Sequence, residues 1–211
     1  KPHFLYNTLD MIHWRALDYE AHDISRMVHQ LSRLFRIGLS NKKWYASLRD
    51  ELLHADCYIA IQKYRQSYPI EYVVEAEKQL LDCLIPKIVL QPFLENAVIH
   101  GFKGRSSAAS LRVSAGTVRR AGGEGLLLTV SDDGCGLPDG FDPANVQGIG
   151  IRNVIERIQL YCGPEYGVDI RPAEGGAGTV VAIMLPFARS EEDIERLRRS
   201  VTNLEDHLAG G

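Results

Sequence analysis

The sequence has 211 residues, 45% hydrophobic and 24% charged, which is enough for one or two globular domains with a buried core. The formal net charge is −3 and basic residues have acidic neighbours, as in Arg49-Asp50-Glu51, so such runs are interpreted as solvated faces and a nucleic-acid surface is excluded. The four cysteines show no C-x-x-C spacing and no apolar run reaches about 18 residues, so we expect reduced thiols and no membrane-spanning segment within this sequence.

The N-terminal part of the chain is predicted to be helical. Apolar residues recur at helical spacing over residues 3–40 without an internal proline or a mid-helix glycine, so one long amphipathic helix is expected. Residues 41–46 are typical of a polar turn, and Ser47, followed by two acidic residues, resembles an N-cap. A second helix over residues 47–64 is expected, and the two helices should form a hairpin.

A hairpin of this length leaves its apolar stripe half exposed. The usual solution is to pair with a second copy in a four-helix bundle, so a homodimer is predicted. The alternative is that the stripe packs against the rest of the same chain.

The chain changes to an α/β pattern after Tyr68-Pro69. Strands are predicted at residues 70–74, 111–118, 126–131, 168–171 and 179–185, and helices at 78–84, 86–102 and 148–162. A hairpin turn is predicted at 121–125 and an amphipathic helical tail at 190–208. The predicted fold class is α+β, a helical hairpin followed by an α/β sandwich, with domain limits at 1–68, 69–188 and 189–211.

A nucleotide pocket is predicted around Asp132, which ends an apolar strand. A carboxylate there can accept a hydrogen bond from an exocyclic amine such as that of adenine, although a turn aspartate is the alternative. Gly134 and Gly136 allow positive φ and let a planar ring lie against the backbone. Gly148 and Gly150 open the next helix, whose free N–H groups and positive dipole end suit phosphate oxygens.

Asn96 lies in the apolar helix predicted over residues 86–102, where a buried amide needs a polar partner. Mg²⁺ held through the side-chain oxygen would supply that partner, with phosphates and water completing the coordination. His100 lies one helical turn further along the same face and is a candidate phosphate contact. The alternative for His100 is a structural histidine.

His3 follows Pro2, which distorts any helix arriving from upstream, so the imidazole is presented at an irregular point. A histidine that is neutral near physiological pH can act as a nucleophile. No metal-ligand spacing such as His-Glu-x-x-His occurs. Four other histidines are interpreted as surface residues: His13, His22, His29 and His54.

Five boxes in this order resemble those of the LytS/YesM branch of bacterial sensor histidine kinases. Residues 2–9 are similar to the phosphoacceptor box, 90–97 with His100-Gly101 to the N box, 132–136 to the G1 box, 148–153 to the G2 box, and 178–179 with 185–186 to the last strand. Residues 47–52 and 58–62 also resemble the second dimerisation helix of that branch. The resemblance covers roughly residues 1–187.

The resemblance implies a dimerisation and histidine-phosphotransfer hairpin followed by a GHKL-type (Bergerat) ATP-binding domain. His3 would be phosphorylated by ATP with Mg²⁺ and would pass the phosphoryl group to an aspartate of a response regulator receiver domain. Asn96 would hold the Mg²⁺, and residues 137–147 would form a short lid. The implied cofactor-binding residues, with Asp132 and Thr179 on the adenine, are Asn96, His100, Asp132, Gly134, Gly136, Gly148, Ile149, Gly150, Asn153 and Thr179.

The chain begins Lys1-Pro2-His3 rather than with methionine, which indicates a fragment or a processed product. We expect the cytoplasmic portion of a bacterial plasma-membrane protein, with at least one transmembrane helix upstream of Lys1.

Phe4 departs from the better-known kinases, which carry an acidic base directly after the histidine. Glu95 and Asn7 are the candidates to orient or deprotonate the imidazole, and Glu95 is also explained as a solvated helix residue. Two other functions remain open. One is an ATP hydrolase of the gyrase or chaperone kind, and the other is a nucleotide-sensing dimerisation module without chemistry.

Overall fold

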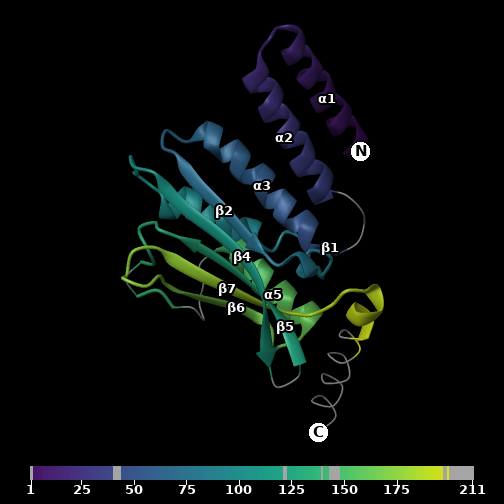
Figure 1. Ribbon diagram of the computed structural model, residues 1–211, viewed down its shortest axis with the longest axis vertical. Helices are drawn as coiled ribbons and strands as arrows, with labels where there is room; N and C mark the ends of the chain where they lie inside the picture. The colour runs from purple at the N-terminus through teal and green to yellow at the C-terminus, as the bar shows by residue number, and fades with distance from the viewer. Residues whose placement is uncertain are drawn as a thin grey trace.

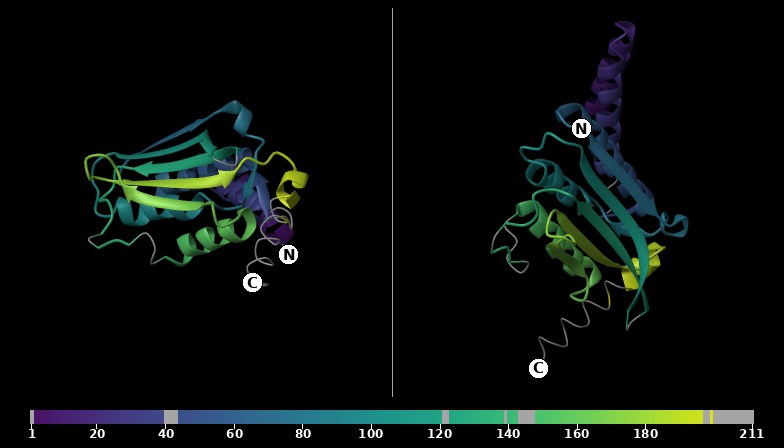
Figure 2. Two further views of the ribbon diagram at one scale, coloured as in Figure 1. Left: turned by 90° about the horizontal axis from the view of Figure 1, so that it is seen from below. Right: turned by 60° about the vertical axis from the view of Figure 1, so that its left-hand side comes forward.

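The computed structural model describes residues 2–39, 44–120, 123–138, 140–142, 148–196 and 199. A helical hairpin stands above a five-stranded sheet that carries helices on one face (Figures 1 and 2). Within these described ranges, no helix combines the length and the apolar character needed to cross a bilayer.

The hairpin consists of α1 (Pro2–Asp18) and α2 (His22–Leu39), which lie side by side (Figure 1). The prediction of one long helix over residues 3–40 is wrong, because the chain reverses between α1 and α2. Glu20 takes a φ of 57° in this reversal, a conformation that side chains other than glycine rarely adopt. The sequence contains no glycine or proline there, so local propensity does not explain the break.

Packing between α1 and α2 explains the reversal instead. Leu9 and Ala16 of α1 are buried at the seam. Polar groups also meet across it, since the Nδ1 atom of His13 lies 2.9 Å from the hydroxyl of Ser25. Folding back therefore gives the two helices a shared interior within one chain.

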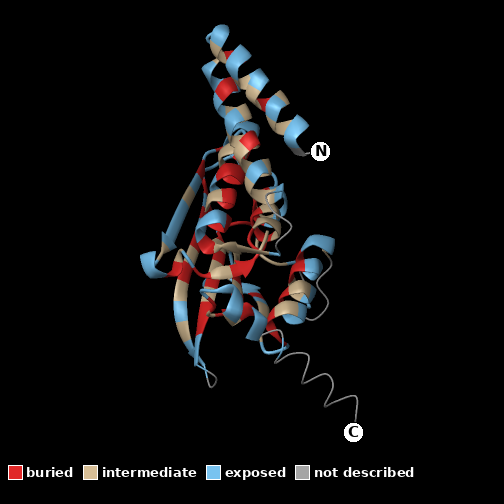
Figure 3. Cartoon of the chain, turned by 90° about the vertical axis from the view of Figure 1, so that its right-hand side faces the viewer, coloured by how far each residue is buried: buried red, intermediate tan, exposed pale blue. Residues whose placement is uncertain are grey.

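The next helix, α3 (Leu48–Arg65), follows the short strand β1 (Tyr45–Ser47). Ser47 caps it as predicted, because its hydroxyl accepts a hydrogen bond from the backbone N–H of Asp50. The expected role of this helix as the second arm of the hairpin is not observed, since α2 is that arm. One face of α3 is buried against the sheet and α2 contacts α3 as well (Figure 3).

The main sheet has the strand order β2-β4-β5-β7-β6, with β2 parallel to β4 and every other pair antiparallel. Its strands are β2 (Ile70–Ala76), β4 (Ala109–Arg120), β5 (Gly123–Asp132), β6 (Gly167–Pro172) and β7 (Thr179–Pro186). All five predicted strands are confirmed. Arg120 pairs with Gly123, as expected for a β4–β5 hairpin, although residues 121–122 of the predicted turn lie outside the described residues.

Of the three helices predicted between residues 78 and 162, one is confirmed, one is wrong and one begins later than predicted. α5 (Ile149–Cys162) agrees with the prediction for 148–162. The helix predicted over 78–84 is wrong, since only one 3₁₀ turn, η1 (Lys78–Leu80), precedes the strand β3 (Leu84–Pro86), which pairs with β1. The helix predicted over 86–102 begins later, because β3 and an irregular segment come first. It consists of α4 (Gln91–Asn96) and a π-helical turn, η2 (Ala97–Gly101).

The core lies between the sheet and the helices α3, α4 and α5. Alternate residues of β4, such as Leu111 and Val113, point into it and are fully buried. The other face of the sheet is more exposed, and there Arg112 of β4 forms an ion pair with Glu75 of β2. The sheet is therefore covered on one side, as expected for a two-layer α/β sandwich.

The fold class is α+β with an N-terminal helical hairpin, as predicted. The four-helix bundle and the domain limits at 68 and 188 stay predictions, because α3 contacts both the hairpin and the sheet. In the predicted tail, residues 191–196 are helical and Ile194 is buried. Most of the remaining tail lies outside the described residues.

Candidate functional site

A cavity of about 750 Å³ opens beside the ends of β5 and β7. This volume suits a nucleotide-sized ligand. One wall comes from α4 and η2, another from the start of α5, and a third from the loop after β5. The lining residues are Phe93, Asn96, Ala97, His100, Gly101, Asp132, Cys135, Gly136, Leu137, Pro138, Gly140, Phe141, Asp142, Gly148, Ile151, Ile170, Thr179 and Val181.

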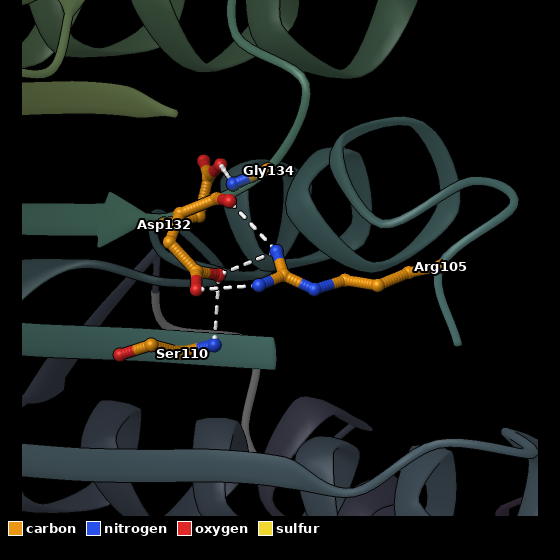
Figure 4. A network of polar contacts seen from close by, with 5 residues as sticks. Arg105, Ser110, Asp132 and Gly134 are labelled. Atoms are coloured by element: carbon orange, nitrogen blue, oxygen red, sulfur yellow. Dashed lines mark hydrogen bonds and ion pairs between the residues drawn. The ribbon is translucent and has the colours of Figure 1, made fainter. Parts of the chain in front are cut away.

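Asp132 is the buried polar side chain of this cavity, with only 9% of its surface exposed. Burial raises the pKa of its carboxyl, while hydrogen bonds from the backbone N–H groups of Gly134 and Thr179 partly oppose that shift. Its Oδ1 atom accepts the Gly134 bond at 2.8 Å (Figure 4). The carboxylate is therefore fixed beside apolar cavity walls that include Ile170 and Val181.

Glycines let three backbone segments meet around Asp132. A Cβ atom on Gly134 would lie 2.6 Å from the carbonyl oxygen of Gly101, and one on Gly178 would collide with the carbonyl oxygen of Asp132. The N–H of Cys135 donates to the same Gly101 oxygen at 2.8 Å. These contacts join the end of η2 to the loop after β5, and a larger residue at either glycine would separate them.

Asp133 ties this loop to the segment after η2. Its carboxylate accepts two hydrogen bonds from the guanidinium of Arg105, at 2.8 and 2.7 Å, and another from the N–H of Ser110 at 2.8 Å (Figure 4). Arg105 also donates to the Asp133 carbonyl at 2.7 Å. The neighbouring aspartates therefore differ, since Asp132 lines the cavity and Asp133 holds the loop.

Asn96 and His100 both line the cavity. The expectation that the Asn96 amide is buried is wrong, because the residue is exposed and lies on the open side of the helix. The helix changes to π-helical geometry directly after Asn96. Such turns occur often at functional sites, and this one places His100 beside the same cavity.

The start of α5 contributes less than the sequence predicts. Gly148 lines the cavity, as do Gly136 and Thr179. Gly150 instead faces Pro92, 3.5 Å from the position that a Cβ atom would take. Gly134, Ile149 and Asn153 are not among the lining residues either, and Ile149 is 76% exposed.

His3 lies on the exposed first turn of α1, with its Nδ1 atom 3.2 Å from the amide nitrogen of Asn7. Among the described residues, none that lines the cavity comes from α1 or α2. Glu95 does not line it either. The Glu95 carboxylate accepts a hydrogen bond from Gln91 at 2.6 Å, and its charge adds to the burial that raises the pKa of Tyr58 on α3. The structure thus brings His3 and Asn7 together and leaves Glu95 apart from them.

Sequence reasoning misjudged three side chains. Glu51 was assigned to a solvated face but is 3% exposed, and His54, assigned to the surface, is 4% exposed. Cys135, which received no role, lines the cavity and is exposed. Helical spacing could have placed Glu51 and His54 near the buried side of α3, since Leu48, Leu52 and Ala55 lie one turn or less away.

The polar groups that line the cavity fit a purine nucleotide. A buried carboxylate beside apolar walls can accept a hydrogen bond from an exocyclic amine. Gly136, with a φ of 79°, also lines the cavity and packs against the backbone of Gly176 and Gly178. Asn96 and His100 offer an amide oxygen and an imidazole that could meet a phosphate-bound cation and phosphate oxygens.

Comparisons with known proteins agree with these features. Residues 1–70 match a family model described as histidine kinase. Sensor histidine kinase YesM of Bacillus subtilis is 34% identical over 187 residues, which make up 88% of this chain and 31% of that protein. Sensor histidine kinase BtsS of Escherichia coli K12 is 29% identical over 187 residues, with coverages of 88% and 32%. The chain thus spans about a third of the length of these relatives.

The fold also has solved counterparts. The histidine kinase domain of a blue-light activated histidine kinase from Erythrobacter litoralis superposes with a TM-score of 0.51 at 21% identity. The match covers 88% of this chain and 94% of that domain. The predicted fold class is therefore confirmed, and the matches to the histidine kinase family model and to YesM confirm the resemblance to the LytS/YesM branch.

Proposed function

Because this chain is a relative of the sensor histidine kinases of the LytS/YesM branch, we propose that it is the kinase portion of such a protein. It binds ATP with Mg²⁺, phosphorylates His3, and passes the phosphoryl group to an aspartate of a response regulator. The observation that carries this proposal is one chain with both an exposed histidine and a cavity whose buried carboxylate suits adenine.

In this proposal, different cavity residues contact the adenine and the phosphates. Asp132 accepts a hydrogen bond from the exocyclic amine of adenine, and Thr179 lies beside it at the paired end of β7. Gly136 allows the ring to approach the backbone. His100 and Gly148 face the phosphates.

Asn96 is the residue that would hold Mg²⁺ through its amide oxygen. The ion, when bound, neutralises charge on the phosphates during transfer. The described part of the predicted lid, Leu137–Pro138 and 140–142, lines the cavity and would limit access of water.

The contact between His3 and Asn7 can set the tautomer of the nucleophile. In the structure the amide nitrogen of Asn7 donates to Nδ1 of His3, which leaves the ring proton on Nε2. Turning the Asn7 amide over would let its oxygen accept an Nδ1–H proton and free the lone pair on Nε2 to attack. A bond then forms between Nε2 and the γ-phosphorus while the bond from that phosphorus to the β–γ bridging oxygen breaks, releasing ADP. Glu95 remains the candidate to remove the imidazole proton, and this needs a second arrangement of the chain.

Among the described residues, none of the hairpin lines the cavity. Phosphorylation of His3 therefore requires the hairpin to approach the cavity. A homodimer solves this if the cavity of one copy serves the histidine of either copy. We also propose that the parent protein is a bacterial membrane sensor with this portion on the cytoplasmic side, since the chain spans about a third of its sensor relatives.

Incubation with γ-labelled ATP and Mg²⁺ tests the proposal. The protein should acquire an acid-labile, base-stable label, and His3→Gln should remove the label while leaving ATP affinity unchanged. His22→Gln, at an exposed histidine of α2, is the matched control. A His3→Gln variant that labels as well as the parent would refute the assignment.

The separation of His3 from the cavity favours a second candidate, a nucleotide-sensing dimerisation module. Nucleotide binding with neither label nor phosphate release, from a protein extended upstream of Lys1, supports that module. Steady phosphate release without label supports an ATP hydrolase.

A further inference from the structure

Glu51 lies in the first turn of α3, yet its carboxylate is buried under the segment that leads into α4. It accepts three backbone hydrogen bonds, from the N–H groups of Ile88 at 2.9 Å, Val89 at 2.7 Å and Leu90 at 2.9 Å. These donors stand at the start of α4, which has no side-chain cap of its own. A carboxylate from another helix therefore satisfies three consecutive N–H groups of the segment that leads into α4.

Ile88 has an unusual backbone conformation, with a φ of 56°. A β-branched residue is strained in this left-handed region, so the surrounding contacts must hold it there. On its N–H side the contact is Glu51, and on its carbonyl side Arg157 of α5 donates a hydrogen bond at 3.0 Å. Oppositely charged groups from two helices thus hold both sides of one strained residue.

We call Glu51, Ile88 and Arg157 the Ile88 clamp. The two charges also act on each other, since Arg157 opposes the burial that raises the pKa of Glu51, and Glu51 opposes the burial that lowers the pKa of Arg157. Replacing Arg157 would leave the buried Glu51 carboxylate with its three backbone hydrogen bonds but without its opposite charge.

The Ile88 clamp connects the elements that line the cavity. Gln91 begins α4 three residues after Ile88, and Asn96 ends it. Arg157 belongs to α5, which begins directly after Gly148 at the other wall. Glu51 belongs to α3, which α2 of the hairpin contacts. A displacement of α3 would therefore also move the start of α4, the helix that carries Asn96.

We infer that Glu51 is a positioning residue for the nucleotide site, which sets the Asn96 helix relative to α5 and couples both to the hairpin. It does not line the cavity and acts through Ile88 and Arg157. This inference rests on the proposed function, because Asn96 matters only if the cavity holds Mg²⁺ and ATP.

The test compares the affinity of a fluorescent ATP analogue with and without Mg²⁺, together with the melting temperature, in the parent and in Glu51→Gln. We expect the folded variant to bind the Mg²⁺ complex roughly tenfold more weakly, since small displacements of positioning groups have effects of this order. Asp50→Asn is the matched control, because it removes an exposed charge from the same turn and should bind like the parent.

Adding Ile88→Gly to Glu51→Gln should restore part of the affinity, because glycine adopts positive φ without support. If Glu51 were purely structural, Glu51→Gln would lower the melting temperature without lowering the affinity of the folded protein, and there would be no affinity to restore.

Arg157→Gln, with exposed Arg152→Gln on the same helix as its control, tests the clamp if Glu51→Gln does not fold. It should weaken Mg²⁺-dependent binding in the same way. If the parent binds and folded Glu51→Gln or Arg157→Gln binds equally well, the inference is overturned while the proposed function stands. If the parent itself binds no nucleotide, the proposed function fails and the inference fails with it.

Discussion

The guanidinium of Arg105 donates two hydrogen bonds to the carboxylate of Asp133, and only 22% of the Arg105 side chain is exposed. This paired geometry is the strong form of a charge-assisted contact. It holds the residue next to the buried Asp132, so the loop after β5 depends on a contact outside the cavity.

Arg105→Ala should therefore lower the free energy of unfolding by ~1 kcal/mol, a value reduced for the partial exposure of the pair. Urea denaturation measures this loss. Arg112→Ala is the control, since its ion pair with Glu75 lies on the open face and is more than half exposed on both sides. An equal or larger loss in Arg112→Ala would contradict the special role of the Arg105 contact.

Asp132→Asn should weaken ATP binding by roughly 10–100-fold, the range expected when a hydrogen bond to a charged acceptor is lost. The amide oxygen can still accept the Gly134 N–H, so the fold should persist. Calorimetric titration with ATP measures the change. Asp169→Asn, at an exposed residue of β6, should bind normally, and unchanged binding by Asp132→Asn would show that adenine is not held there.

Cys135 offers a reporter that needs no activity. It is exposed in the cavity wall, whereas Cys57, Cys83 and Cys162 are buried. Burial raises the pKa of all three buried thiols, that of Cys162 to about 12, which keeps them in the unreactive thiol form.

A maleimide should thus label one cysteine of the folded chain, and Cys135→Ser should abolish the labelling. ATP should slow the reaction at Cys135 as it fills the cavity. Mass spectrometry over time follows both effects, and a rate that saturating ATP does not change would argue against nucleotide in this cavity.

His54 predicts a pH dependence of stability. Burial in α3 lowers its pKa below the ordinary value of 6.5, so the unfolded chain takes up a proton more readily than the folded one. The stabilising contribution of neutral His54 is complete above pH 6.5 and is lost as the pH falls below that value towards the folded pKa.

Between pH 7.5 and 5.5, the melting temperature of the parent should fall more than that of His54→Gln. His22→Gln, at an exposed position of α2, should fall as much as the parent. Parallel pH profiles for the parent and His54→Gln would contradict the prediction.

The exposed side of α1 predicts self-association. Phe4, Met11 and Trp14 are 77%, 60% and 65% exposed, and they lie near one another at helical spacing. Trp14→Arg should shift the chain from dimer towards monomer in sedimentation velocity, whereas Arg15→Ala should not. A parent chain that stays monomeric at micromolar concentrations would refute the predicted homodimer.

The sequence predicted the strands well, because alternation is a local signal. Of the ten residues predicted to bind the nucleotide, six line the cavity and four at or near glycine turns do not. Asp132 ends an apolar strand and is followed by glycines, and its place in the cavity could be foreseen. The reversal at Glu20 could not, since packing between α1 and α2 causes it without a helix breaker. Glu51 was missed because an acid in the first turn of a helix is ordinarily solvated, and its partners lie almost forty residues away.

Around Asp132 the chain packs backbone against backbone, with glycines at 134 and 178 where a Cβ atom would collide with a carbonyl oxygen. Main-chain atoms are common to all residue types, so side-chain substitutions in the neighbouring strands leave the shape of the backbone around Asp132 unchanged. If the cavity holds a nucleotide as proposed, its affinity and selectivity depend on the side chains of the walls, in α4, η2 and residues 137–138 and 140–142. On that proposal, related chains can diverge in how fast they take up and release nucleotide while the backbone around Asp132 stays the same.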